Sequence, residues 1–182
     1  MRRVGAVAVV VVGSVALLAR PWLVDLPLDP VTVLVALFVV LGLVGATWRL
    51  PAPADARPGP VPAWLALGLG VGAFGAGRLL AVGTLPAAPL VLRSVVLNSL
   101  AAVSEEAFFR RFAYGLAAAR GPLLAVVTSA VAFAAVHVTV WGWAVLPLDL
   151  AAGLVLGWQR WASGRWSVPA ATHVAANVLA VW

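Results

Sequence analysis

Long apolar runs that end at an arginine or a proline are the feature that most limits what this chain can fold into. A helix that crosses the hydrocarbon core of a bilayer needs about 20 mostly apolar residues. Hydrophobic residues make up 64% of the 182 residues and charged residues only 10%, whereas a soluble domain is about 45–50% apolar and about 25% charged. Such a chain cannot cover a surface that faces water. The sequence therefore predicts an all-α, polytopic transmembrane helix bundle.

Seven apolar segments are candidate spans. They are Val4–Ala19, Val31–Trp48, Pro62–Val82, Leu90–Ala119, Leu123–Val140, Trp143–Gln159 and Trp166–Trp182. The polar stretch Pro51–Pro60 is expected to be a linker. We divide the chain into three N-terminal transmembrane helices (1–89) and a four-helix bundle (90–182) that carries the chemistry. The start Met-Arg-Arg followed by an apolar run is also typical of a signal peptide, but no convincing cleavage motif precedes Arg20, so we expect a retained helix.

All twelve basic residues are arginines, against six acidic residues, and cysteine is absent. The missing cysteines exclude disulfides and thiolate chemistry. The arginines lie at the ends of apolar runs, a pattern that fixes the orientation of a membrane protein, so no nucleic-acid partner is expected. An N-in, C-out arrangement leaves Arg20 and Arg93 outside. It places on or near the cytoplasmic side Arg2, Arg3, Arg49, Arg57, Arg110, Arg111, Arg120, Arg160 and Arg165.

The polar residues inside the predicted spans carry the functional signal. An ionisable group at the centre of a membrane helix costs about 2.5–3.5 kcal/mol on insertion scales and usually faces a cavity or a partner. The chain has two glutamates and two histidines, Glu105, Glu106, His137 and His173, and all four fall within predicted spans, as does Asn177. Their placement predicts a polar site inside the bundle.

Helical geometry assigns different surroundings to the two glutamates. Glu106 and Arg110 are four residues apart and share a helix face, which suits an ion pair. Glu105 is rotated by about 100° from Glu106 and is therefore the freer carboxylate. Glutamate in apolar surroundings suits a general base that activates water.

The two histidines and Glu105 come from three different helices and could converge in the bundle core. At 1.5 Å per residue from the cytoplasmic ends, Glu105 and His137 lie roughly 20 Å deep and His173 about 10 Å. Tilt or a break near Pro169 would have to close that gap. Imidazoles with a carboxylate could bind zinc or hold a water, and Asn177 could donate a hydrogen bond to an oxyanion.

Three short motifs resemble those of the CPBP family, the CAAX prenyl protease 2-like intramembrane proteases that are also called Abi proteins. The family pattern is E-E-x-x-x-R, then F-x-x-x-H, then H-x-x-x-N or D, on successive membrane helices. The chain has Glu105-Glu106-Ala-Phe-Phe-Arg110, Phe133-Ala-Ala-Val-His137 and His173-Val-Ala-Ala-Asn177 in this order. The resemblance covers residues 97–182, whereas the first ninety residues match only in being transmembrane.

The resemblance implies an intramembrane endopeptidase that cleaves a peptide or protein at the membrane. Glu105 would activate the water, Glu106 and Arg110 would support it, and Asn177 would stabilise the oxyanion. His137 and His173 would bind a metal, with Zn²⁺ held by Glu105 and both histidines, or would hold only water. The family is described as metalloprotease, and a metal-free, glutamate-driven mechanism has also been argued, so both remain open.

Two residues depart from the family pattern. Arg111 stands where a glycine commonly follows the motif arginine, and we expect it to alter the turn or to add a charge at the inner surface. Asp149, beside Pro147, belongs to no family motif. It could extend the polar network or pair with an arginine, but we favour a helix-break residue near the outer interface.

Two function classes remain from the sequence. One is the protease; the other is a non-catalytic membrane scaffold, such as a bacteriocin self-immunity or adaptor protein. A transporter would also use charges near the midplane, but inverted repeats are missing. The preference for arginine over lysine, with much alanine and valine, suggests a GC-rich prokaryotic genome and hence the prokaryotic plasma membrane. Processing of prenylated CAAX proteins would be unexpected there.

Overall fold

The computed structural model describes residues 2–48, 59–80 and 92–180, and every element in these ranges is helical. The α-helices are α1 (Arg2–Leu18), α2 (Arg20–Leu23), α3 (Pro30–Thr47), α4 (Ala63–Leu80), α5 (Leu92–Glu106), α6 (Tyr114–Ala117), α7 (Pro122–Ala135), α8 (Val138–Trp141), α9 (Leu146–Ser163) and α10 (Ser167–Ala180). A π-helical segment, η1 (Ala107–Ala113), and two 3₁₀ turns, η2 (Ala118–Arg120) and η3 (Trp143–Val145), join some of them. The all-α prediction is therefore confirmed for these ranges.

Each of the seven predicted segments contains a helix, but three of them are interrupted. The π-helical η1 interrupts the fourth segment, a turn at His137 separates α7 from α8, and η3 precedes α9. Within residues 2–48, 59–80 and 92–180, three helical stretches are long and apolar enough to cross a membrane: Pro30–Thr47, Ala63–Leu80 and Pro122–Trp141. A shorter apolar helix covers Val4–Leu18. Seven crossings and the N-in, C-out orientation remain predictions. Most of the predicted linker lies outside the described residues.

The outer surface of the bundle is apolar. Large hydrophobic side chains are strongly exposed on helices from both halves of the chain, among them Val4, Leu80 and Trp143, with 75%, 87% and 78% of their surface exposed. An exposed apolar surface of this kind marks contact with lipid or another apolar partner rather than with water. The surface therefore agrees with the membrane prediction.

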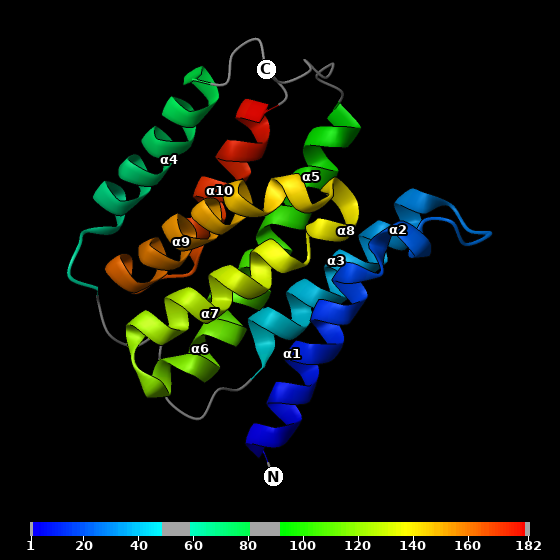
Figure 1. The fold of residues 1–182 in the computed structure, drawn as a ribbon, viewed down its shortest axis with the longest axis horizontal. Coiled ribbons are helices and arrows are strands. Elements are labelled where there is room, and N and C mark those ends of the chain that lie inside the picture. Colours follow the sequence, from blue (N-terminus) through cyan, green and yellow to red (C-terminus); the bar gives the residue numbers. More distant parts are fainter. Residues whose placement is uncertain (1, 49–58, 81–91, 181–182) are drawn as a thin grey trace.

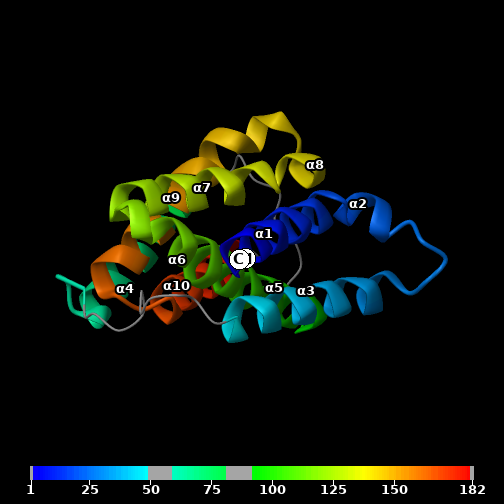
Figure 2. The ribbon, with the colours of Figure 1, turned by 90° about the horizontal axis from the view of Figure 1, so that it is seen from below.

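The helices surround a core built on η1. Helix α7 packs along α9, and α5 packs against both α3 and α10, as Figure 1 shows. Seen from below, α7 and α8 lie on one side of the molecule and α3, α5 and α10 on the other (Figure 2). The core combines three phenylalanines of η1 with side chains of α1, α3, α7 and α9: Phe108, Phe109, Phe112, Leu17, Phe38, Phe133 and Leu156.

Helix α3 lies directly against the backbone of η1 at Gly45. A Cβ atom on Gly45 would lie 2.5 Å from the carbonyl carbon of Ala107 and 2.6 Å from the backbone nitrogen of Phe108. Arg111 donates hydrogen bonds to the carbonyl oxygens of Gly45 and Trp48 at the end of α3. Arg111 thus caps the C-terminus of a neighbouring helix, where free carbonyls and the helix dipole favour a cation.

Replacing Gly45 by alanine is expected to destabilise the protein by about 1–3 kcal/mol, since overpacking against backbone forces the two segments apart. Thermal unfolding in detergent measures the effect. Gly72→Ala on α4 is the control, because its Cβ would meet nothing within 4 Å. Equal melting temperatures for the two variants would contradict the close approach of α3 and η1.

Candidate active site

Glu105 lies in the last turn of α5 and faces the turn between α7 and α8. Its side chain is almost completely buried. Oε1 accepts a hydrogen bond from Nη1 of Arg20 at 3.2 Å, and Oε2 lies 3.7 Å from Nε2 of His137. The second distance is too long for a direct hydrogen bond, but a water bonded to both atoms can span it. The predicted approach of Glu105 and His137 is therefore present.

His137 stands between two carboxylates. Its Nδ1 lies 2.8 Å from the carbonyl oxygen of Phe133 and 3.6 Å from Oδ2 of Asp149. A carbonyl oxygen only accepts, so Nδ1 carries a proton, and Nε2 is directed at Glu105. Gly142, at a φ of 79°, provides the turn after α8 that leads the chain back through η3 into α9. Asp149 lies in the first turn of α9 beside Pro147, as the helix-break prediction expected, and its carboxylate near His137 also extends the polar network.

Glu106 and Arg110 form the predicted ion pair. Oε1 of Glu106 lies 3.2 Å from Nη1 of Arg110, and both side chains are fully buried. The same oxygen lies 3.0 Å from Nδ1 of His173. Arg110 also donates to the carbonyl oxygen of Gly153 at 3.3 Å. His173 on α10 is therefore held by Glu106, whereas the sequence analysis placed it with Glu105.

The ring of Phe133 contacts both halves of this polar network. Its centroid lies 4.6 Å from that of His137 and 5.5 Å from that of His173. The guanidinium carbon of Arg110 lies 4.3 Å from the same centroid, a cation–π distance. Phe133 thus packs against both imidazoles. One imidazole belongs to the pair Glu105–His137 and the other to the pair Glu106–His173.

Asn177 lies one turn beyond His173 on α10 and bridges to α5. Its Nδ2 donates to the carbonyl oxygen of Asn98 at 3.2 Å. The side-chain amide has two donor hydrogens, and this bond uses one of them. The role of Asn177 as an oxyanion donor remains a prediction.

The donor atoms do not fit a zinc site made by Glu105, His137 and His173. Zinc needs its nitrogen and oxygen ligands about 2.0–2.2 Å from one ion. Glu105 and His137 face each other, and His173, whose Nδ1 is bonded to Glu106, would have only Nε2 to offer a metal. Among the side chains that the structure describes, no three His, Cys, Asp or Glu residues are grouped to hold a metal.

Arg20 and Arg160, which were predicted only as charges at the ends of spans, lie inside the molecule, as does the ion-pair partner Arg110. Arg110 and Arg160 are buried, and the side chain of Arg20 is only 11% exposed. Arg160 donates to the carbonyl oxygen of Arg110 at 3.0 Å and lies over the ring of Tyr114. An arginine at the end of an apolar run looks the same in sequence whether it points to water or into the bundle, so the positive-inside pattern could not separate these cases.

Gln159 is a structural residue that the sequence analysis missed. Its Nε2 donates to the carbonyl oxygen of Ala66 at 2.7 Å and to the hydroxyl of Thr172 at 2.8 Å. It therefore ties α9 to α4 and to the residue before His173. The available signal was that Gln159 is the single glutamine of the chain and falls within a predicted span.

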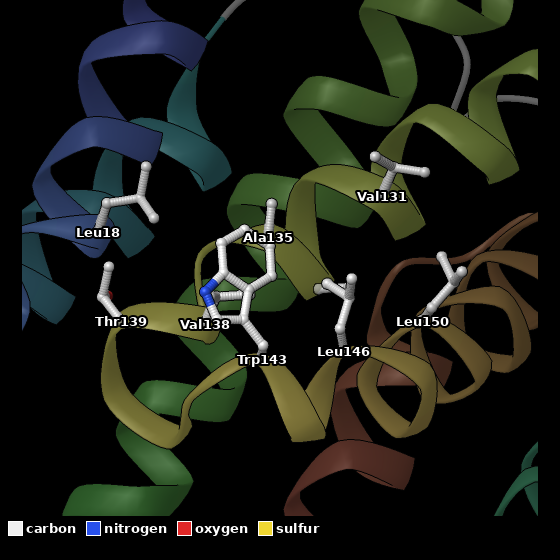
Figure 3. Close-up of a pocket in the computed structure, with 9 residues that line it drawn as sticks. Leu18, Val131, Ala135, Val138, Thr139, Trp143, Leu146 and Leu150 are labelled. Carbon is white, nitrogen blue, oxygen red and sulfur yellow. The ribbon is translucent and has the colours of Figure 1, made fainter.

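An apolar hollow of about 500 Å³ lies beside the turn that carries His137. Figure 3 shows Leu18 of α1 and Thr139 of α8 on one side, Leu146 and Leu150 of α9 on the other, and Trp143 between them. The remaining lining residues come from α7 and α8: Val131, Ala134, Ala135 and Val138. The hollow can accept an apolar group close to the polar network.

Fold and site together define a helical membrane protein with a carboxylate–imidazole site enclosed among its helices. A family model described as Type II CAAX prenyl endopeptidase Rce1-like matches residues 86–179, slightly more than half of the chain. The protein belongs to this family of membrane proteases. No curated protein and no solved structure gives a significant match to the chain.

Proposed function

We propose that this protein is an intramembrane endopeptidase in which Glu105 activates the attacking water. The observation that carries the proposal is the opposed pair formed by Oε2 of Glu105 and Nε2 of His137, 3.7 Å apart in a buried site. In the proposed state the His137 ring is neutral, so both atoms are acceptors and can receive the two hydrogens of one water while its lone pair stays free. Family membership supports peptide-bond hydrolysis over the non-catalytic scaffold.

In the proposed reaction, Glu105 accepts a proton from the water as its oxygen attacks the peptide carbonyl carbon. The carbon–oxygen double bond opens to an oxyanion, and the second amide hydrogen of Asn177 is the proposed donor to it. Collapse of this intermediate breaks the carbon–nitrogen bond, and the proton held by Glu105 passes to the leaving nitrogen. Glu106, Arg110 and His173 are proposed to hold α5, η1 and α10 together around this pair.

The substrate is proposed to be a membrane-attached peptide whose apolar group enters the hollow beside His137. The family description names prenylated CAAX proteins, in which a cysteine, two aliphatic residues and a terminal residue end the chain. A prokaryotic plasma membrane is the proposed location, so another lipid-attached peptide could take this place. The shared chemistry is a peptide bond next to a large apolar group.

The test is hydrolysis of a quenched fluorescent peptide that ends in a farnesylated CAAX sequence, with the purified protein in proteoliposomes. The same peptide without the farnesyl group is the matched probe. Cleavage of the farnesylated peptide, with little cleavage of the other, supports both the protease and the role of the hollow. Equal cleavage of both probes would remove the hollow from the proposal, and cleavage of neither would contradict the proposed activity on this substrate class.

Removal of metals is expected to leave this hydrolysis unchanged, because the described donors do not gather around one point. The measurement compares turnover before and after dialysis against a chelator, with the metal content determined by mass spectrometry. Loss of turnover that returns on addition of Zn²⁺ would show that the site rearranges to bind the ion.

A further inference from the structure

Arg20 uses all three nitrogens of its guanidinium group on acceptors around the site. Nε donates to the carbonyl oxygen of Leu17 at 2.9 Å, Nη1 to Oε1 of Glu105 at 3.2 Å, and Nη2 to the carbonyl oxygen of Val136 at 3.1 Å. The three acceptors belong to α1, α5 and the turn after α7. A planar fork of donors is needed to reach three such acceptors at once, and arginine supplies it.

The contact with Glu105 leaves one carboxylate oxygen for chemistry. Arg20 binds Oε1, and Oε2 is the oxygen that faces Nε2 of His137. A carboxylate that is not held can rotate about its terminal torsion, which has a broad energy minimum. Arg20 therefore selects the orientation in which Oε2 and His137 oppose each other.

The second contact of Arg20 reaches the partner of Glu105. Val136 directly precedes His137, and its carbonyl oxygen accepts from Nη2. One side chain thus touches the general base and the backbone that positions the imidazole. The side chain of Arg20 is 11% exposed and that of Glu105 is 4% exposed. Water therefore screens this charged pair poorly.

Arg20 lies far outside the segment that defines the family. The matched residues begin at 86 and contain every motif glutamate and histidine. The residue instead opens α2, after the turn that ends α1, and is followed by a proline. Its sequence position alone indicates a charge at the end of a span.

We infer that Arg20 is a positioning residue for the proposed hydrolysis: it holds the Glu105 carboxylate against His137 from a helix that the family motifs do not include. The inference rests on the proposed function. It predicts a defect in the chemical step, with substrate binding in the hollow preserved.

Arg20→Gln is expected to lower kcat by about 10²-fold, the low end of what a general base contributes, and to change KM by no more than about threefold. Arg20→Lys keeps the charge without the fork and should recover part of kcat. The assay uses the farnesylated peptide. Arg78→Gln is the matched control, since Arg78 also donates through Nε to a backbone carbonyl, that of Leu179, but lies away from Glu105.

A second readout does not depend on turnover. The chain has two glutamates, so protein labelled with ¹³C-glutamate has two labelled side-chain carboxylates, and subtraction of the Glu105→Gln spectrum isolates the infrared carboxylate stretch of Glu105. We expect that band to shift in Arg20→Gln and to stay in place in Arg78→Gln. Arg20→Lys provides the same comparison if the glutamine variant does not fold.

The possible outcomes separate the two proposals. A lower kcat with a shifted band supports the positioning role, whereas an unchanged kcat or an unmoved band overturns it. If the wild-type protein cleaves neither peptide, the proposed function on this substrate class fails, and the band alone decides whether Arg20 holds Glu105.

Discussion

Glu105→Gln is expected to abolish measurable peptide hydrolysis, with a loss of about 10³-fold or more, since general-base catalysis contributes about 10²–10⁴-fold. Glutamine keeps the size of the side chain and can still accept from Arg20, but it cannot take a proton from water. The measurement is turnover of the farnesylated peptide by protein with an unchanged melting temperature.

Asp29→Asn is the control for a change of carboxylate to amide. Asp29 caps α3 by accepting hydrogen bonds from the backbone and the hydroxyl of Thr32, both at 2.8 Å, and asparagine can do the same. This variant should retain full turnover. Activity that survives in Glu105→Gln would remove Glu105 from the chemistry, and a cellular immunity function that survives would favour the non-catalytic scaffold.

Arg110→Met is expected to cause the largest loss of stability, about 3–5 kcal/mol, because it leaves a buried carboxylate without its cation. Glu106 and Arg110 are both 0% exposed, and His173 alone would remain beside Glu106. Thermal unfolding in detergent measures the loss.

Two further variants make this test specific. Arg120→Met changes an exposed arginine and should leave the melting temperature nearly unchanged. Arg110→Met combined with Glu106→Gln removes both charges and should be less destabilised than the sum of the single changes. Additive losses would mean that the two side chains are not coupled.

The membrane class could be predicted from composition, and composition also singled out candidate residues for a site. Apolar residues dominate the chain, so each carboxylate or imidazole within a run stands out, and the candidates Glu105, Glu106, His137 and His173 were identified in this way. The ion pair of Glu106 with Arg110 was also predictable, since residues four apart share a helix face. These inferences need no knowledge of how the helices pack.

The pairing of His173 could not be predicted in the same way. Its partner depends on the rotation and tilt of α10 against α5, which the sequence does not reveal. The π-helical turns of η1 add a second unknown, because they rotate the residues after Glu106 relative to a continuous α-helix. Arg20 was missed for a related reason: nothing near it in sequence indicates that α1 ends beside Glu105.

Arg20 lies before the family-matched segment, and this position matters for chimaeras made between members of the family. The matched segment holds the motif residues, yet one cation that contacts Glu105 comes from the part before residue 86. A chimaera that joined this segment to the leading helices of another family member would transfer the motifs but not that contact. The family-matched segment, residues 86–179, therefore does not contain every residue that contacts Glu105. Each new set of leading helices would have to supply its own counter-charge to Glu105.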